Sequence, residues 1–132
     1  MHLTRKADYS LLIILEIASQ EGWVSLREIS QKTKIPLSFT RNILYSLSKG
    51  GLILSKEGIR GGYKIARPVN DISVKNVIEA SGFNLAMTLC MHSTCDKSSF
   101  CRSRKILEKI NNEIIERLDH IKVKDLIYAE NT

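Results

Sequence analysis

Residues 36–67 read PLSFTRNILYSLSKGGLILSKEGIRGGYKIAR, and this stretch decides the fold. It begins with Pro36, a residue that is common in the first turn of a helix. The pair Gly50 and Gly51 is typical of a helix end. Between these positions the apolar residues recur at the spacing of one helix face: Ile43, Leu44 and Leu47. The pattern therefore predicts an amphipathic helix over residues 36–49.

The opposite face of this helix is polar and basic. It carries hydrogen-bond donors, acceptors and cations: Ser38, Thr40, Arg41, Asn42, Tyr45 and Lys49. Residues 37–49 contain no Asp or Glu, whereas a face selected only for solubility usually carries acids as well. The pattern favours a helix that enters the major groove of DNA over a merely solvated face.

Two strand-like runs follow at residues 52–56 and 63–67, and a glycine-rich turn joins them. This arrangement predicts a β-hairpin. The turn presents Arg60, and Lys64 follows shortly after it. By itself this would be an ordinary exposed turn. After a DNA-reading helix, however, a basic hairpin is typical of the wing of a winged helix, whose arginine enters a narrow minor groove.

Two further helices are expected before this stretch. Residues 3–20 place their apolar side chains on one face of a first helix. Ser25 is the expected N-cap of a short second helix that ends near Lys34, and Glu28 is placed to close a capping box. Two short helices with a tight connection predict a helix-turn-helix, in which residues 36–49 read DNA.

Length and charge support this interpretation. The chain has 132 residues, about one domain, with an ordinary apolar fraction of 43%. Residues 1–67 hold 11 Lys or Arg and 5 Asp or Glu, which accounts for the whole net charge of +6. A basic half attracts a polyanion, most often nucleic acid. The longest apolar run, Leu11–Leu15, is too short to span a membrane, so we expect a cytoplasmic protein without membrane contact.

The sequence of the second half of the chain, residues 68–132, predicts further helices. Residues 68–71 form a linker, Ser73 caps a helix through Ala80, and residues 83–89 fit a loop or a short helix. A long helix is expected at about 103–122. Its apolar stripe consists of Leu107, Ile110, Ile114, Leu118 and Ile121, and Ile106 and Ile115 widen it. Asn111 and Asn112 are expected to face away. So long an apolar face needs a partner, and a second copy is favoured over packing within the monomer.

Three cysteines lie in a polar segment, residues 90–101, between these helices. They are Cys90, Cys95 and Cys101. An odd number of clustered cysteines is a poor disulfide framework, whereas thiolates on one loop suit zinc or an iron–sulfur cluster. Their spacing is wider than the two-residue spacing of zinc fingers, which favours the bulkier cluster. Free reactive thiols are the alternative.

Four features in this order carry a family resemblance. They are residues 3–9 (LTRKADY), residues 61–67 of the wing (GGYKIAR), the cysteine loop and the long helix. Together they resemble the winged-helix transcription regulators that include IscR, NsrR and RirA, over nearly the whole chain. The resemblance implies a mostly α fold with a small β-hairpin wing. It also implies a homodimer on near-palindromic promoter DNA, and a 4Fe-4S or 2Fe-2S cluster on the cysteine loop.

The resemblance also implies a ligand set. Cys90, Cys95 and Cys101 match the three cysteine ligands of the family. The IscR branch has a histidine three residues after the third cysteine, where this chain has Arg104, which cannot serve as a ligand. The NsrR branch takes a carboxylate from the first helix of the partner subunit, and Asp8 occupies that place. We therefore expect Asp8 as the fourth ligand, with His92 as the competing choice.

The sequence thus predicts a dimeric transcriptional regulator, a repressor by the family's commoner habit, whose cluster senses nitric oxide, redox state or iron. Residues 1–67 would bind DNA, and residues 68–132 would supply the cluster loop and the dimerisation helix, within one compact domain. No nucleophile–base pair or phosphate loop is evident, so we do not expect an enzyme. One alternative keeps the DNA reader but places structural zinc or redox-active thiols on the loop. A more distant one is an iron–sulfur redox protein that does not bind DNA.

Overall fold

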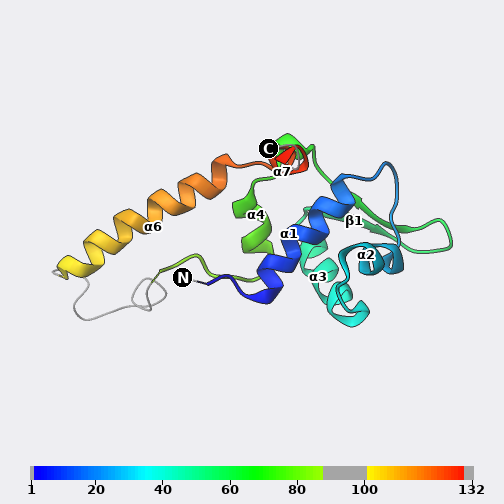
Figure 1. Cartoon of the computed structure of the whole chain (residues 1–132), viewed down its shortest axis with the longest axis horizontal. Coiled ribbons are helices and arrows are strands. Elements are labelled where there is room, and N and C mark those ends of the chain that lie inside the picture. Colours follow the sequence, from blue (N-terminus) through cyan, green and yellow to red (C-terminus); the bar gives the residue numbers. More distant parts are fainter. Residues whose placement is uncertain (1, 88–100, 130–132) are drawn as a thin grey trace.

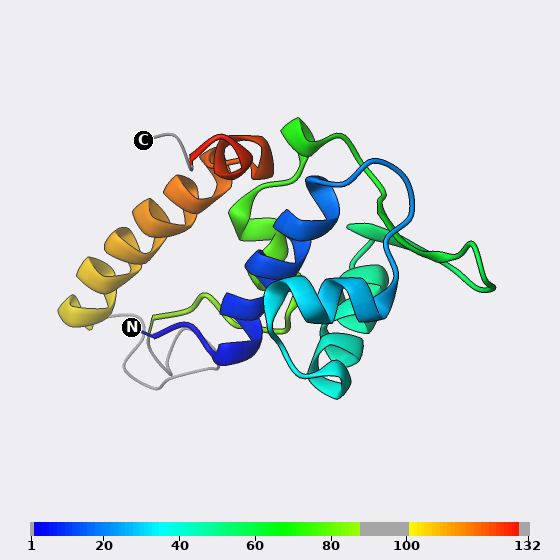
Figure 2. The same cartoon turned by 45° about the vertical axis from the view of Figure 1, so that its right-hand side comes forward.

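The computed structural model describes residues 2–87 and 101–129 (Figures 1 and 2). In chain order its elements are α1 (Arg5–Ala18), α2 (Leu26–Thr33), α3 (Leu37–Lys49), β1 (Ile53–Lys56), β2 (Gly62–Ile65), the 3-10 turn η1 (Val69–Asp71), α4 (Val74–Ala80), α6 (Arg102–His120) and α7 (Val123–Ile127). The described part is mostly helical, with one two-stranded antiparallel sheet. The predicted fold class, a winged helix-turn-helix with a long additional helix, is confirmed.

The first two helices begin at residues whose side chains cap them. Thr4 caps α1 by accepting a hydrogen bond from the Ala7 amide at 3.1 Å. Ser25 caps α2 by accepting from the Glu28 amide at 3.2 Å. The expected capping box does not close, because the Glu28 carboxylate pairs with Lys32 one turn later. Such a cap contributes about 1 kcal/mol to helix stability.

The tight connection between α2 and α3 has two specific supports. Lys34 ends α2 in the left-handed conformation, with φ of 58°. The Ser30 hydroxyl donates a hydrogen bond to the Ile35 carbonyl at 2.6 Å, which fixes the chain as it enters α3. These contacts set the angle between the two helices, and so produce the helix-turn-helix that the sequence predicts.

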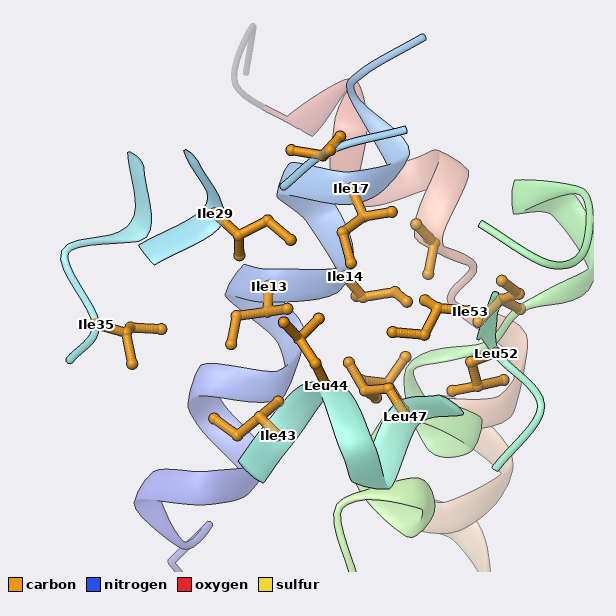
Figure 3. Packing of buried hydrophobic residues seen from close by; sticks show 14 residues of the cluster. Ile13, Ile14, Ile17, Ile29, Ile35, Ile43, Leu44, Leu47, Leu52 and Ile53 are labelled. Carbon is orange, nitrogen blue, oxygen red and sulfur yellow. The ribbon is translucent and has the colours of Figure 1, made fainter. Parts of the chain in front are cut away.

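The core of the DNA-binding half forms where α1, α2, α3 and β1 meet (Figure 3). Its largest members are fully buried: Ile13, Ile14, Ile17, Ile29, Ile43, Leu44, Leu47 and Leu52. In the figure, the side chains of α1 point toward those of α3. Each fully buried aliphatic side chain contributes about 1.5–3 kcal/mol, so this cluster holds α3 rigidly in place.

The hairpin is attached to the start of α2 as well as to α3. β1 and β2 pair antiparallel, with Ile53 opposite Ile65 and Lys56 opposite Gly62. Val24 and Tyr63 exchange two backbone hydrogen bonds, each 2.8 Å long. This bridge adds a short third strand at the base of the hairpin. Beyond the bridge the hairpin projects from the body, on the right in Figures 1 and 2.

The second half of the chain begins with the predicted helix α4, but its end differs from the prediction. Ser73 and Asn76 form a closed capping box at the start of α4. The predicted long helix ends at His120 rather than near residue 122, because the chain there pairs with the residues before α4. The Val74 amide donates to the Ile121 carbonyl at 2.8 Å. The short helix α7 that follows was not predicted. Residues 83–87, the described part of the ambiguous segment, are not helical.

The predicted orientation of α6 is wrong at Asn111, Ile110 and Ile106. Asn111, expected to face away, is only 5% exposed and is the buried residue of the helix. Ile110 and Ile106, expected to lie on or beside the buried stripe, are 40% and 62% exposed. Within the chain, α6 packs through Ile115, Leu118 and Ile121, a set turned around the helix from Ile106 and Ile110. The residues that sequence reasoning assigned to one stripe therefore divide between two faces.

Helix α4 joins the two halves. Val74 and Ile78 pack with Ala7 of α1 and with α6 in a second buried cluster. At its other end, Ala80 approaches Gly50 so closely that a Cβ on Gly50 would lie 2.9 Å from the Ala80 Cβ. A shift of α4 would therefore change its contacts with both α1 and α3. Among the described residues, no helix is long and apolar enough to cross a bilayer.

Candidate nucleic-acid interface and cysteine site

The outer face of α3 carries most of the predicted DNA contacts. Five of the six α3 residues predicted to contact DNA are exposed: Ser38, Arg41, Asn42, Tyr45 and Lys49. Tyr45 has 68% of its surface exposed. The face offers a guanidinium, an amide, hydroxyl groups and an ammonium, which is the set of groups that reads base edges and phosphates.

Thr40 does not belong to this face, and its prediction as a DNA contact is wrong. Its side chain is fully buried. Its hydroxyl donates to the carbonyls of Ile35 and Pro36, at 3.2 and 3.0 Å. The reason is the helical period: Thr40 lies one turn before Leu44, on the side of α3 that packs on the core. Thr40 therefore stabilises the turn between α2 and α3.

The wing presents the two predicted cations. Arg60 and Lys64 are both exposed, Arg60 in the turn and Lys64 on β2. The turn also exposes Ile59 completely, which sequence reasoning missed. Its position beside Arg60 at the end of a glycine-flanked turn was the available signal, because a large apolar residue there has no core to join. At the base, the Lys56 ammonium lies 5.7 Å from the centre of the Trp23 ring.

Two acidic side chains near the helix-turn-helix form ion pairs with one lysine of α2. Lys32 pairs with Glu16 of α1 at 3.6 Å and with Glu28 of α2 at 3.4 Å. By contrast, within the part of the chain that the structure describes, Arg41 and Arg60 have no ion-pair partner. Their charges are available to a polyanion, since pairing within the chain does not neutralise them.

Of the three predicted cysteine ligands, Cys101 is the one that lies among the described residues. Cys101 is half-buried and caps the N-terminus of α6, where its Sγ accepts a hydrogen bond from the Arg104 amide at 3.4 Å. The thiolate is the form of cysteine that binds metal. Cys90, Cys95 and the competing ligand His92 lie outside the described residues.

Asp8, the predicted fourth ligand, has a carboxylate that is available to bind a metal. It lies in the first turn of α1 and its side chain is exposed. Its carboxylate has no hydrogen bond or ion pair with any residue in the described ranges 2–87 and 101–129. Within those same ranges no three His, Cys, Asp or Glu side chains gather as a metal site.

Comparison with known proteins decides the family. The family model for Rrf2, described as an iron-dependent transcriptional regulator, matches residues 3–129. The chain belongs to the Rrf2 family. Its Rrf2 relatives act in transcription, so DNA-binding regulation is the shared function, and it is not an enzymatic one.

Named Rrf2 relatives match over most of their length. An HTH-type transcriptional regulator of Haemophilus influenzae is 32% identical over 134 residues, covering 99% of this chain and 89% of that protein. IscR of Pectobacterium atrosepticum is 32% identical over 130 residues, covering 96% of this chain and 79% of that protein.

Solved Rrf2-type structures share the fold. The structure of T. potens IscR is 26% identical, with a TM-score of 0.77, covering 96% of this chain and 86% of that one. CymR, the global cysteine regulator of B. subtilis, aligns with a TM-score of 0.79 at 22% identity, covering 100% and 98% of the two chains. At that identity the second likeness concerns the fold alone.

Proposed function

We propose that this Rrf2 protein is a homodimeric repressor whose affinity for promoter DNA is controlled by an iron–sulfur cluster. The observation that carries the DNA-binding part is the acid-free face of α3, on which Arg41 has no ion-pair partner among the described residues. In this arrangement α3 enters the major groove and Arg60 reaches the adjacent minor groove. Repression is the habit of most regulators that the sequence resembles.

The homodimer is supported by the outward face of α6. Ile106 and Ile110 are 62% and 40% exposed on a 19-residue helix. In both views α6 leans away from the body, and its N-terminal end lies farther from α4 than its C-terminal end does (Figures 1 and 2). A second copy that covers this face would bury both isoleucines, and a two-fold dimer would present two α3 helices to two half-sites.

The donor set fits an iron–sulfur cluster. Three cysteine thiolates suit iron, and Cys101, one of the three, is held at the N-terminus of α6. The exposed carboxylate of Asp8 would complete the set from the partner subunit. Thiolates are the usual cluster ligands, so a carboxylate would be the weakest of the four bonds. When bound, the cluster supplies a centre that reacts with nitric oxide or oxygen and depends on iron supply.

A path leads from this carboxylate to the DNA-reading helix. Asp8 lies in the first turn of α1, which is anchored by the Thr4 cap. One turn further on, Ile13 and Ile14 are fully buried against α3 (Figure 3). A change in the tension on Asp8 would therefore shift α1 against α3. Because both half-sites must be bound together, a small change in helix separation is enough to alter DNA affinity.

The experiment begins with protein purified without oxygen. Visible absorbance together with iron, sulfide and zinc analysis shows whether the loop holds a cluster, zinc or free thiols. Asp8→Ala should lower cluster retention and leave the fold and the dimer intact. Asp71→Ala, an exposed carboxylate on η1, is the matched control. Colourless, iron-free protein that binds DNA normally would contradict the proposal, as would an unchanged spectrum in Asp8→Ala.

The DNA part is tested separately with duplexes selected from a randomised library. Affinity should fall steeply as salt rises, because phosphate contacts release counterions. Treatment of the cluster-loaded protein with nitric oxide or a chelator should change that affinity. Affinity that does not vary between low and moderate salt would exclude the proposed docking of α3 and the wing.

A further inference from the structure

We propose that the chain binds a small apolar α-amino acid in a cavity between α4 and α6, a site separate from the DNA surface and from the cysteine ligands. The cavity has a volume of about 520 Å³, within the range of small-molecule sites. The C-terminal end of α4, residues 82–86 and α6 from Arg104 to Ile115 line it, and it is open to solvent on one side. Binding itself is independent of the proposed cluster, whereas its effect on DNA rests on the proposed function.

A buried amide is the first sign of a ligand. Asn111 lines the cavity and is only 5% exposed. Its Oδ1 finds no hydrogen-bond donor among the described residues. A buried polar atom without a partner costs about 1–3 kcal/mol. On a dimerisation helix otherwise rich in isoleucine, an apolar residue would avoid that cost. The position is explained if a ligand supplies an N–H or O–H donor to Oδ1.

A cation on the same wall of the cavity is the second sign of a ligand. Arg104 lines the cavity one helical turn from Glu108, and its Nε lies 4.0 Å from Glu108 Oε2. That contact is at the outer limit of an ion pair and uses one of the five guanidinium donors. The remaining donors form a planar fork that fits a carboxylate. A ligand with a carboxylate would therefore be held more firmly than the present Glu108 side chain.

The other residues that line the cavity indicate which further groups the ligand must carry. Phe83, Leu85 and Ile115 contribute apolar walls, and Glu79 stands at the rim beside Lys75, 3.7 Å away. The ligand thus needs a carboxylate for Arg104, an N–H donor for Asn111 and an apolar part for these walls. An α-amino acid with an aliphatic or aromatic side chain carries all three groups on one small skeleton.

The cavity is placed where a ligand would matter. Its α6 wall includes Arg104, whose backbone amide donates a hydrogen bond to the Sγ of Cys101. Its α4 wall ends beside Ala80, which is packed against Gly50 at the end of α3. The chain just after α6 is fixed by backbone bonds between Ile121 and Val74 and between Val123 and Ile72, while α6 borders the cavity from Arg104 to Ile115. Occupancy would therefore set the position of the first half of α6 relative to the DNA-reading unit.

The test uses the full chain without DNA. Titration calorimetry and protein NMR with L-leucine, L-methionine and L-phenylalanine should show saturable binding, with shifts of the Asn111 side-chain amide. Leucinamide lacks the carboxylate and 4-methylpentanoate lacks the amine. Each should bind at least about tenfold more weakly than L-leucine, the loss expected for one charge-assisted hydrogen bond. Equal binding of all three would overturn the assignment of Arg104 and Asn111.

Variants separate a binding role from a structural one. Asn111→Leu should abolish binding while the melting temperature stays equal or rises, since it removes an unpaired buried group. Arg104→Gln should weaken binding at least about tenfold, and Arg102→Gln, an exposed neighbour outside the cavity, should not. Lower stability of Asn111→Leu with unchanged binding would overturn the proposal. Absence of binding in wild type, with dissociation of the dimer by Ala86→Trp, would assign the cavity to a second copy instead.

Discussion

Gly62 of β2 lies directly against the backbone of Val24: a Cβ placed on Gly62 would be 2.4 Å from the Val24 carbonyl oxygen. Gly62 also has φ of +137°, a conformation that other residues rarely adopt. The same two strands are joined by paired hydrogen bonds between Val24 and Tyr63. The wing is thus anchored to the helix-turn-helix through a contact that only glycine permits.

Gly62→Ala is therefore expected to destabilise the protein by about 3 kcal/mol, since the new methyl group meets backbone atoms that cannot move away. Urea unfolding followed by circular dichroism measures this change. Gly58→Ala is the matched control, because Gly58 also has positive φ but has nothing within 4 Å of the added Cβ. It should cost only about 1 kcal/mol. Similar losses in the two variants would show that strain alone, without the contact to Val24, accounts for the effect.

Thr40→Val should lower stability by about 1 kcal/mol and leave the DNA affinity of the folded protein unchanged. The reason is that the Thr40 hydroxyl serves the carbonyls of Ile35 and Pro36, and valine keeps the shape while removing both bonds. Unfolding curves and DNA titrations on the same samples distinguish the two effects. A selective loss of DNA affinity would restore Thr40 to the DNA-reading face.

Arg41→Ala should weaken specific binding by about 1–3 kcal/mol if its guanidinium reads a guanine edge. Fluorescence anisotropy with a selected duplex, and with the same duplex altered one base pair at a time, measures the loss and finds the base involved. Arg27→Ala is a matched control on the exposed surface of α2. A uniform loss on every sequence would mean that Arg41 contacts phosphate rather than a base.

The wing prediction concerns Arg60 and its apolar neighbour. Arg60→Ala should weaken binding most on duplexes with A/T-rich flanks, because the narrow minor groove there has the most negative potential. Ile59→Ser should weaken binding by a similar factor on A/T-rich and G/C-rich flanks, because an apolar contact with sugars does not depend on that potential. Affinities measured on paired duplexes that differ only in the flanks provide the comparison. Wild-type affinity in both variants would remove the wing from the interface.

The sequence predicted the DNA-binding half well because its signals are local. Ser25 and Ser73 cap the helices assigned to them, and the stripe of Ile43, Leu44 and Leu47 is buried as expected. Caps and helical periodicity depend on residues three or four apart, so they can be recognised without knowledge of the fold. Thr40 was misassigned because its polarity hid an inward position that the same period implies.

The second half was less predictable because contacts distant in sequence decide it. The end of α6 at His120 is set by backbone pairing of Ile121 with Val74, almost fifty residues earlier. Asn111 is buried because α6 presents Ile115 and Leu118, rather than Ile110, to α4. A helix with apolar residues on two faces does not reveal which face meets its own chain. The proposed ligand set cannot be judged from local pattern either, since it joins Cys101 to an Asp8 of another copy.

That second face gives the last prediction. Ile106 and Ile110 are exposed on α6, so a double change to glutamate leaves the core of one protomer intact but puts two charges into the proposed dimer contact. Ile106→Glu with Ile110→Glu should convert the dimer to a folded monomer, measured by sedimentation. Affinity for a two-half-site duplex should then fall to that for a single half-site. Leu54→Glu together with Tyr128→Glu, which also adds two charges at exposed apolar positions, should remain dimeric. If the α6 variant sediments as wild type does, α6 is not the dimer contact, and the partner's Asp8 would need another route to the cysteine loop.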